Sequence, residues 1–170
     1  MSNRPKPDEY SAFHSGYINL VNDEPILDLL ENLKESTYSF FTELPADKAD
    51  YAYGEGKWTI KELLGHMIDT ERTFAYRILA FSRGQEELPG FDENTYVENA
   101  TFGSRLFYDL VNEFRTVRES NMYLFRSLSM EQLAATGIAS GKAISVNALL
   151  YITAGHEMHH LNIIKEKYLS

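Results

Sequence analysis

Three of the five histidines in the chain lie within five residues near its C-terminal end, in the sequence His156-Glu157-Met158-His159-His160. Imidazole is the commonest side-chain ligand of protein-bound metals and a frequent proton carrier in catalysis. Two histidines four positions apart lie on one face of a helix, where both can bind the same ion. The cluster therefore predicts a metal site if this segment is helical and another part of the chain supplies a third ligand.

The segment 146–168 is expected to be a helix, because Ser145 is a suitable N-cap and apolar residues follow at helical spacing. At about 100° per residue, His156 and His160 fall inside the broad apolar arc of this helix. His159 falls at the edge of the arc. We therefore expect His156 and His160 to point inward and His159 to point outward.

His66 is the best candidate for the third ligand, because it lies in a second expected helix, whereas His14 lies near the N-terminus. The polar residues around His66 could orient its imidazole through the second ring nitrogen, as metal-bound histidines usually require; they are Glu62, Asp69, Thr70 and Thr73. Three neutral imidazoles leave coordination positions open, which is typical of a catalytic metal site. The alternative is that these histidines are hydrogen-bonded core residues without a metal.

The same five C-terminal residues match the H-E-x-x-H motif of zinc metalloproteases, in which the glutamate is the general base. We disfavour a protease because only ten residues follow His160 to supply the downstream ligand, and no strand is predicted to align a peptide. Glu157 remains a candidate base or acceptor beside the metal. The favoured alternative pairs Glu157 and Glu71 with groups on other helices or subunits, since a buried carboxylate is costly unless it is paired.

Apolar periodicity predicts four long helices and no convincing strand, which indicates an all-α four-helix bundle. Thr59 and Glu62 form a capping-box pattern at the start of the second helix. The expected helices are 25–44, 59–82, 104–128 and 146–168. The other segments are an extended N-terminal arm (1–20), a long connection between the second and third helices that is either a loop or a short turn of helix (85–103), and a short helical piece with a glycine-rich turn (129–142). Residues 21–170 are expected to form one domain.

Composition excludes several classes of function. The chain has 170 residues, with 16 Lys and Arg against 25 Asp and Glu, and a net charge of −9. Such an acidic chain is poorly suited to bind nucleic acid or an anionic membrane. The absence of cysteine excludes disulfides, a cysteine nucleophile and thiolate metal ligands. No apolar run is long enough to cross a membrane, and no apolar segment follows the N-terminus, so we expect a cytoplasmic protein.

Two segments resemble the signatures of the DinB-like superfamily. Residues 56–66, GKWTIKELLGH, followed by Asp69 and Glu71, are similar to its second-helix signature, and residues 155–164, GHEMHHLNII, to its fourth-helix signature. The resemblance covers about residues 20–168. Within the superfamily, the chain most resembles the branch that includes bacillithiol S-transferases and proteins described as metal-dependent hydrolases.

The resemblance implies a bundle with one divalent metal ion, most commonly nickel or zinc, in a pocket at one end. The residues that match the family's ligands are His66, His156 and His160. The resemblance also implies a homodimer, and it places the loop 88–93 near the pocket in some relatives. Asp92 is therefore a second candidate, beside Glu157, for contact with substrate or water, although a structural role as a helix N-cap or a turn residue is favoured for it.

The leading functional hypothesis is a metal-dependent enzyme that acts on a small molecule, most concretely by S-transfer from a low-molecular-weight thiol. A metal ion would bind such a thiol as the thiolate, which is its nucleophilic form. The alternatives are a metal-dependent hydrolase, a non-enzymatic metal- or ligand-binding module of a stress response, and a structural bundle without metal. Arg72, Arg77 and Arg105 are possible anchors for an acidic thiol, but surface positions are favoured for them.

Overall fold

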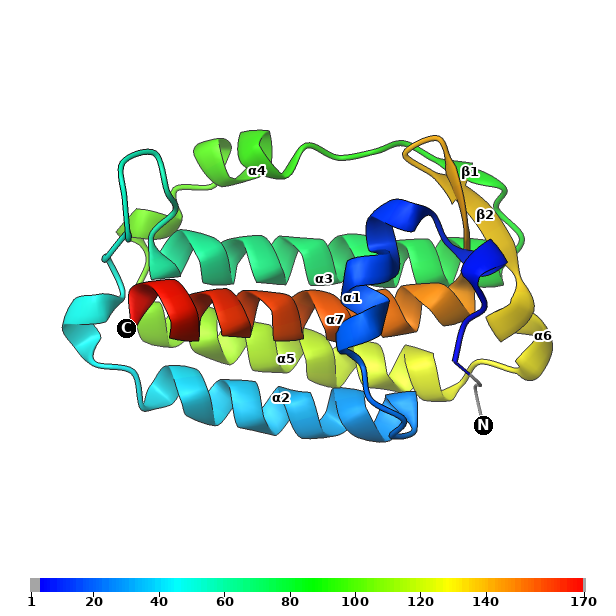
Figure 1. Cartoon of the computed structure of the whole chain (residues 1–170), viewed down its shortest axis with the longest axis horizontal. Coiled ribbons are helices and arrows are strands. Elements are labelled where there is room, and N and C mark those ends of the chain that lie inside the picture. Colours follow the sequence, from blue (N-terminus) through cyan, green and yellow to red (C-terminus); the bar gives the residue numbers. More distant parts are fainter. Residues whose placement is uncertain (1–3, 170) are drawn as a thin grey trace.

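Four long helices lie side by side in the computed structural model, which describes residues 4–169 (Figure 1). They are α2 (Ile26–Thr42), α3 (Ile60–Ser82), α5 (Phe107–Arg126) and α7 (Val146–Ile163), and one wide helical turn (Ile164–Tyr168) extends α7. Helix α7 packs against α2 and α3, and α5 packs against the same two helices. The predicted four-helix bundle is confirmed. No helix within residues 4–169 combines the length and apolarity that crossing a membrane requires.

The helices that carry the histidines begin where their capping residues predict. The Thr59 side chain accepts a hydrogen bond from the backbone N–H of Glu62, whose carboxylate accepts one from the backbone N–H of Thr59. At the start of α7, Ser145 Oγ accepts from the backbone N–H of Ala148. Each such cap contributes about 1 kcal/mol of stability. Helix α3 ends before Gly84, which adopts a positive φ of 88°.

A small three-stranded sheet lies at the end of the bundle where α3 ends and α7 begins (Figure 1). Strand β1 (Glu87–Leu88) pairs in parallel with β2 (Thr136–Ala139), which pairs antiparallel with β3 (Lys142–Ser145). The expectation of no strands is therefore wrong. Strands of two and four residues are too short to show an alternating pattern in the sequence. The short helical piece is confirmed as α6 (Met130–Ala134).

The connection between α3 and α5 contains, besides β1, a short helix and a helical turn. Helix α4 (Glu93–Asn99) runs along the outer side of α3, and the single turn Phe102–Ser104 follows it (Figure 1). The ring of Phe102 packs so closely on α3 that a Cβ atom on Gly65 would lie 2.4 Å from it. The long connection is thus held against α3 over much of its length.

The N-terminal segment is not an extended arm, as the sequence suggested, because much of it is helical. It contains the single turns Pro7–Glu9 and Ala12–His14, followed by helix α1 (Ser15–Leu20), which lies across α7 (Figure 1). Ile18 of α1 is fully buried. A six-residue helix spans fewer than two turns, so it carries too little periodicity to be recognised in the sequence.

A buried ion cluster joins the long helices. Arg118 of α5 has no exposed surface, and its Nε and Nη2 atoms each lie 2.7 Å from a carboxylate oxygen of Glu71 on α3. Its Nη2 atom also donates to Glu157 of α7 at 2.7 Å, and its Nη1 atom donates to the carbonyl oxygen of Leu30 on α2 at 3.1 Å. Glu157 accepts a further hydrogen bond from Thr37 of α2. The interpretation of Glu71 and Glu157 as interhelical partners is confirmed.

We predict that Arg118→Met destabilises the protein by about 3–5 kcal/mol at pH 8, because it leaves two buried carboxylates without a cation. The loss should be smaller at pH 5. Burial already raises the pKa of Glu157 despite the opposing charge of Arg118, and removing Arg118 raises it further. A carboxyl whose pKa is higher in the folded state takes up a proton on folding, so stability rises as the pH falls. Urea unfolding at the two pH values measures the difference.

The matched control is Arg126→Met on the same helix, where an exposed arginine pairs with Glu31. An exposed ion pair contributes no more than about 1 kcal/mol, so this variant should unfold almost as the parent does. Equal losses in the two variants would contradict the assigned role of Arg118.

We predict that Gly155→Ala destabilises the protein by about 1–3 kcal/mol, since overpacking of a buried contact costs energy of this order. A Cβ atom at position 155 would lie 2.1 Å from the backbone oxygen of Tyr17 in α1, so α1 would have to move. The control is Gly16→Ala in α1, where a Cβ atom meets nothing within 4 Å. This control should be neutral or stabilising by up to about 1 kcal/mol. Thermal unfolding compares the stability of the two variants with that of the parent. A Gly155→Ala variant as stable as the parent would contradict the close packing of α1 on α7.

Candidate metal centre

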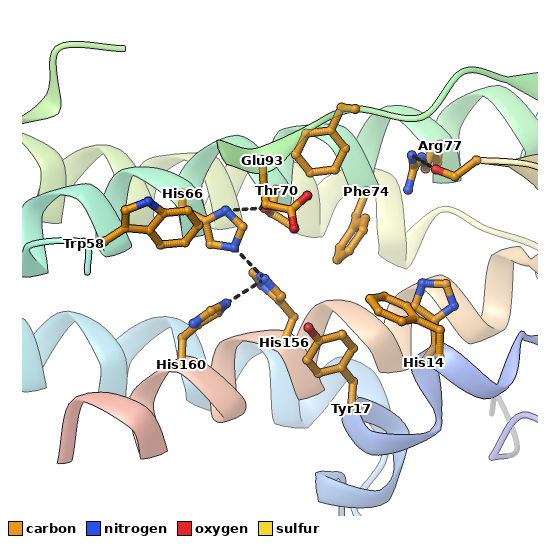
Figure 2. Close-up of a pocket in the computed structure, with 13 residues that line it drawn as sticks. His14, Tyr17, Trp58, His66, Thr70, Phe74, Arg77, Glu93, His156 and His160 are labelled. Atoms are coloured by element: carbon orange, nitrogen blue, oxygen red, sulfur yellow. Dashed lines mark hydrogen bonds between the residues drawn. The ribbon is translucent and has the colours of Figure 1, made fainter. Parts of the chain in front are cut away.

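The structure brings His66, His156 and His160 together between α3 and α7. His156 Nε2 lies 3.1 Å from His66 Nε2 and 3.0 Å from His160 Nε2 (Figure 2). One ligand atom from each residue lies within 4.8 Å of the others, and all three side chains are buried. The two helices pack side by side, so residues 90 positions apart in the sequence present their ring nitrogens to one point.

The surroundings hold the imidazoles in place. Thr70, one turn after His66 on α3, places its hydroxyl oxygen 3.4 Å from His66 Nδ1. The ring of Trp58 lies 4.9 Å from the ring of His66, and the ring of Tyr17 lies edge-on to His156 at 5.6 Å between centroids. A contact to the second nitrogen orients a histidine whose first nitrogen binds a metal. Within residues 4–169, His160 Nδ1 is buried and has no such partner.

The three rings are suitable metal donors because each is neutral at pH 7. Burial lowers the pKa of His66 to about 4 and, with the charges of neighbouring histidines, that of His160 to about 3. The same causes place the pKa of His156 well below its usual value. Each ring therefore has a nitrogen lone pair available. Zinc–nitrogen bonds are about 2.0–2.1 Å, so two ligands about 90–100° apart lie roughly 3 Å from each other. The distances from His156 Nε2 to the Nε2 atoms of His66 and His160 fit ligands of one ion.

The histidines line one end of a pocket with a volume of about 290 Å³. Segments from α1, α3, α4 and the β2–β3 turn form its walls, which are rich in aromatic rings. Besides the three histidines, the lining residues are Phe13, His14, Tyr17, Trp58, Thr70, Phe74, Arg77, Phe91, Glu93 and Ser140. A metal ion at the histidines would thus be open to a small molecule, which distinguishes a catalytic site from a closed structural one.

The remaining candidates do not line this pocket. Glu157 is adjacent to His156, but its carboxylate is held by Arg118 and Thr37 in the ion cluster. Asp92 is exposed and caps α4, where its carboxylate accepts hydrogen bonds from two backbone N–H groups, as its favoured interpretation predicted. His159 is half-buried against the ring of Tyr17 and lies outside the cluster of ligand nitrogens.

Sequence reasoning did not identify Tyr17 or Glu93 as pocket residues, and it favoured the wrong exposure for Arg77. Tyr17 comes from α1, which the sequence did not predict, and Glu93 comes from α4, where the sequence indicated a loop or a short turn of helix. Burial together with the charge of Glu93 raises the pKa of Tyr17. Arg77, for which a surface position was favoured, is 6% exposed and lies in the pocket. A signal for Arg77 does exist in the sequence. It follows His66 by eleven residues, so the two side chains project from nearly the same face of α3.

Fold and site together define a four-helix bundle with three converging histidines at the end of an aromatic pocket. The chain belongs to the DinB superfamily, whose family model matches residues 29–164. None of the curated proteins matches the sequence.

Two solved structures from Bacillus subtilis share the fold. YfiT is described as a probable metal-dependent hydrolase with an unusual four-helix bundle topology. It is 17% identical to this chain, with a TM-score of 0.68 over 97% of this chain and 91% of its own. The DinB-like protein YjoA is 19% identical, with a TM-score of 0.60 over 85% of this chain and 90% of its own.

We predict about one divalent ion per chain, as expected for a single three-histidine site. The ion should be lost in His66→Ala and in the double variant His156→Ala/His160→Ala. His159→Ala should retain it, because His159 does not reach the cluster. Metal analysis by mass spectrometry of untagged protein incubated with zinc or nickel, followed by desalting, provides the measurement. Equal metal content in all four proteins would contradict the assignment, and circular dichroism checks that each variant is folded.

Proposed function

We propose that this protein is a metal-dependent enzyme that hydrolyses a small molecule bound in the pocket. The observation that carries the proposal is that three neutral imidazoles and one carboxylate, that of Glu93, face the same cavity. Glu93 is the only acidic residue among the described residues that line it. Figure 2 draws its carboxylate between His66 and Phe74, on the side of the pocket opposite His156. The description of YfiT as a probable metal-dependent hydrolase supports this choice of reaction.

His66, His156 and His160 would hold the ion, and zinc or nickel are the proposed metals. A divalent ion held there supplies a Lewis acid that lowers the pKa of water and polarises a substrate carbonyl. Glu93 would accept a proton from the attacking water and pass it to the leaving group. Burial and the charge of Glu93 raise the pKa of Tyr17, so its hydroxyl keeps its proton and would donate a hydrogen bond to the oxygen that becomes negative. The aromatic walls would keep bulk water away.

S-transfer from a low-molecular-weight thiol is the second candidate. The chain has no cysteine, so a thiolate nucleophile must come from a co-substrate. The pocket is wide enough for a small thiol, and thiolate sulfur is a good ligand for zinc. A thiol loses its proton far more readily than water does, so this reaction depends less on Glu93. Replacing Glu93 should therefore slow hydrolysis more than it slows S-transfer.

We predict that Glu93→Gln lowers kcat for hydrolysis by about 10²-fold or more, because general-base catalysis contributes roughly this much. Its metal content should not change. The zinc-loaded protein would be tested with 4-nitrophenyl esters for hydrolysis, and with glutathione or cysteine plus 1-chloro-2,4-dinitrobenzene for S-transfer. The control is Glu98→Gln, which removes an exposed acid from the same short helix, away from the pocket.

Hydrolysis at the parent rate by Glu93→Gln would exclude the proposed base. If the parent catalyses S-transfer to 1-chloro-2,4-dinitrobenzene, with release of chloride, but does not hydrolyse the esters, the second candidate is favoured. Metal binding without turnover in either assay would point to the non-enzymatic module instead.

A further inference from the structure

Arg77 is buried without an anionic partner. It is 6% exposed, and no carboxylate of the described residues forms an ion pair with it. Its two hydrogen bonds both come from Nη2 and are long, 3.3 Å to Ser140 Oγ and 3.5 Å to the carbonyl oxygen of Pro89. A buried charge is costly unless it is paired, and the other buried arginine, Arg118, binds two carboxylates. The Nε and Nη1 atoms of Arg77 therefore lack a hydrogen-bond partner among the described residues.

Arg77 lies at the end of the pocket away from the three histidines (Figure 2). The two ends are separated by Phe74, whose ring centroid is 5.8 Å from that of His156 and 6.0 Å from the guanidinium carbon of Arg77. The ring of Phe91 lies 5.8 Å from the same carbon. His66 and Arg77 are about 16 Å apart along the axis of α3, at about 1.5 Å per residue. The pocket thus has a metal-binding end, an aromatic middle and a cationic end.

The cationic end is built by the small sheet and the loop before α4. Ser140, in the β2–β3 turn, has a positive φ of 53° and supplies one of the two acceptors of Arg77. Lys142 of β3 does not line the pocket, but its ammonium nitrogen lies 5.0 Å from the ring of the lining residue Phe13 and adds a positive charge beside this end. After burial, the charges of Lys142 and Arg77 are the causes that lower the pKa of His14 to about 4. Glu93 is the only acidic group among the described lining residues, and it lies nearer the histidines (Figure 2). This end is therefore suited to an anion.

We propose that Arg77 binds an anionic group of the substrate, a carboxylate or a phosphate, while the reacting group lies at the histidines. The substrate is then an elongated anion with an apolar segment between its two ends. This inference rests on the proposed function, because the reacting end is defined by the metal centre. The same anion site would serve an anionic ester in hydrolysis and an acidic thiol in S-transfer. A guanidinium presents paired donors that match both anions, and Phe74 and Phe91 hold its position by cation–π contacts.

The test compares two chelating probes that differ at one end: suberic acid monohydroxamate, which carries a carboxylate, and its uncharged methyl ester. The hydroxamate would bind the metal ion, and the six-methylene chain would carry the carboxylate toward Arg77. Isothermal titration of the zinc-loaded full chain should give at least a tenfold tighter Kd for the acid than for the ester. Arg77→Met should abolish this preference without weakening the ester. Arg77→Lys should restore part of it, because a single charge replaces the paired donors.

Arg83→Met is the matched control, since it removes an exposed arginine just beyond the end of α3. It should retain the full preference for the acid, and urea unfolding checks that the Arg77 variants are folded. Equal affinity for acid and ester in the parent would overturn the inference while leaving the metal centre intact. A preference that survives in Arg77→Met would overturn it as well.

Failure of both hydroxamates to bind would instead count against the proposed function. The inference would then be decided with 4-phenylbutyrate and neutral 4-phenylbutanamide, which lack a hydroxamate and span only the aromatic middle and the cationic end. Tighter binding of the carboxylate that is lost in Arg77→Met would support the anion site. Equal binding, or no binding of either compound, would overturn it.

Discussion

The burial of Arg118 between Glu71 and Glu157 constrains the register of the helices that form the site. Glu157 directly follows His156 on α7, and Glu71 directly follows Thr70, which contacts His66 on α3. Sliding either helix by one turn would leave buried charges unpaired, at a cost of several kcal/mol. The cluster therefore fixes the positions of α3 and α7 relative to each other along their axes. The convergence of three ring nitrogens within 4.8 Å depends on this alignment, so Arg118 supports the site without touching it.

The sequence predicted the bundle and the three converging histidines because both depend on helical periodicity. Long amphipathic helices repeat their pattern over several turns, and the pair His156 and His160 has a spacing that only a helix turns into proximity. The sheet and α1 could not be predicted in the same way, since their elements have six residues or fewer and are stabilised by contacts with the bundle. Helix α4 was anticipated only as a loop or a short turn of helix. Arg118 was missed as the partner of Glu71 and Glu157 because such pairing requires knowledge of how α5 packs.

The parts that were hardest to predict also supply much of the pocket wall around the histidines and Arg77. Helix α1 contributes Tyr17, α4 contributes Glu93, and the β2–β3 turn contributes Ser140. The long helices of the bundle supply the imidazoles and Arg77. With this division, the short elements can change while the bundle keeps the three histidines in place. It also explains why a family model and two structures under 20% identical show the fold but leave the substrate open.

The whole protein is negatively charged, whereas the end of its pocket at Arg77 is positively charged. A net charge of −9 repels anions at long range, but at physiological ionic strength this repulsion is screened beyond about 8 Å. Inside the pocket, Arg77 and a divalent ion at the histidines would act across a few ångströms of aromatic surface, where water screens charges poorly. Two positive centres separated by apolar rings would favour substrates that carry an anionic group at the right distance from the reacting group. A compact anion could reach one centre or the other, whereas an elongated one satisfies both, so length becomes part of the specificity.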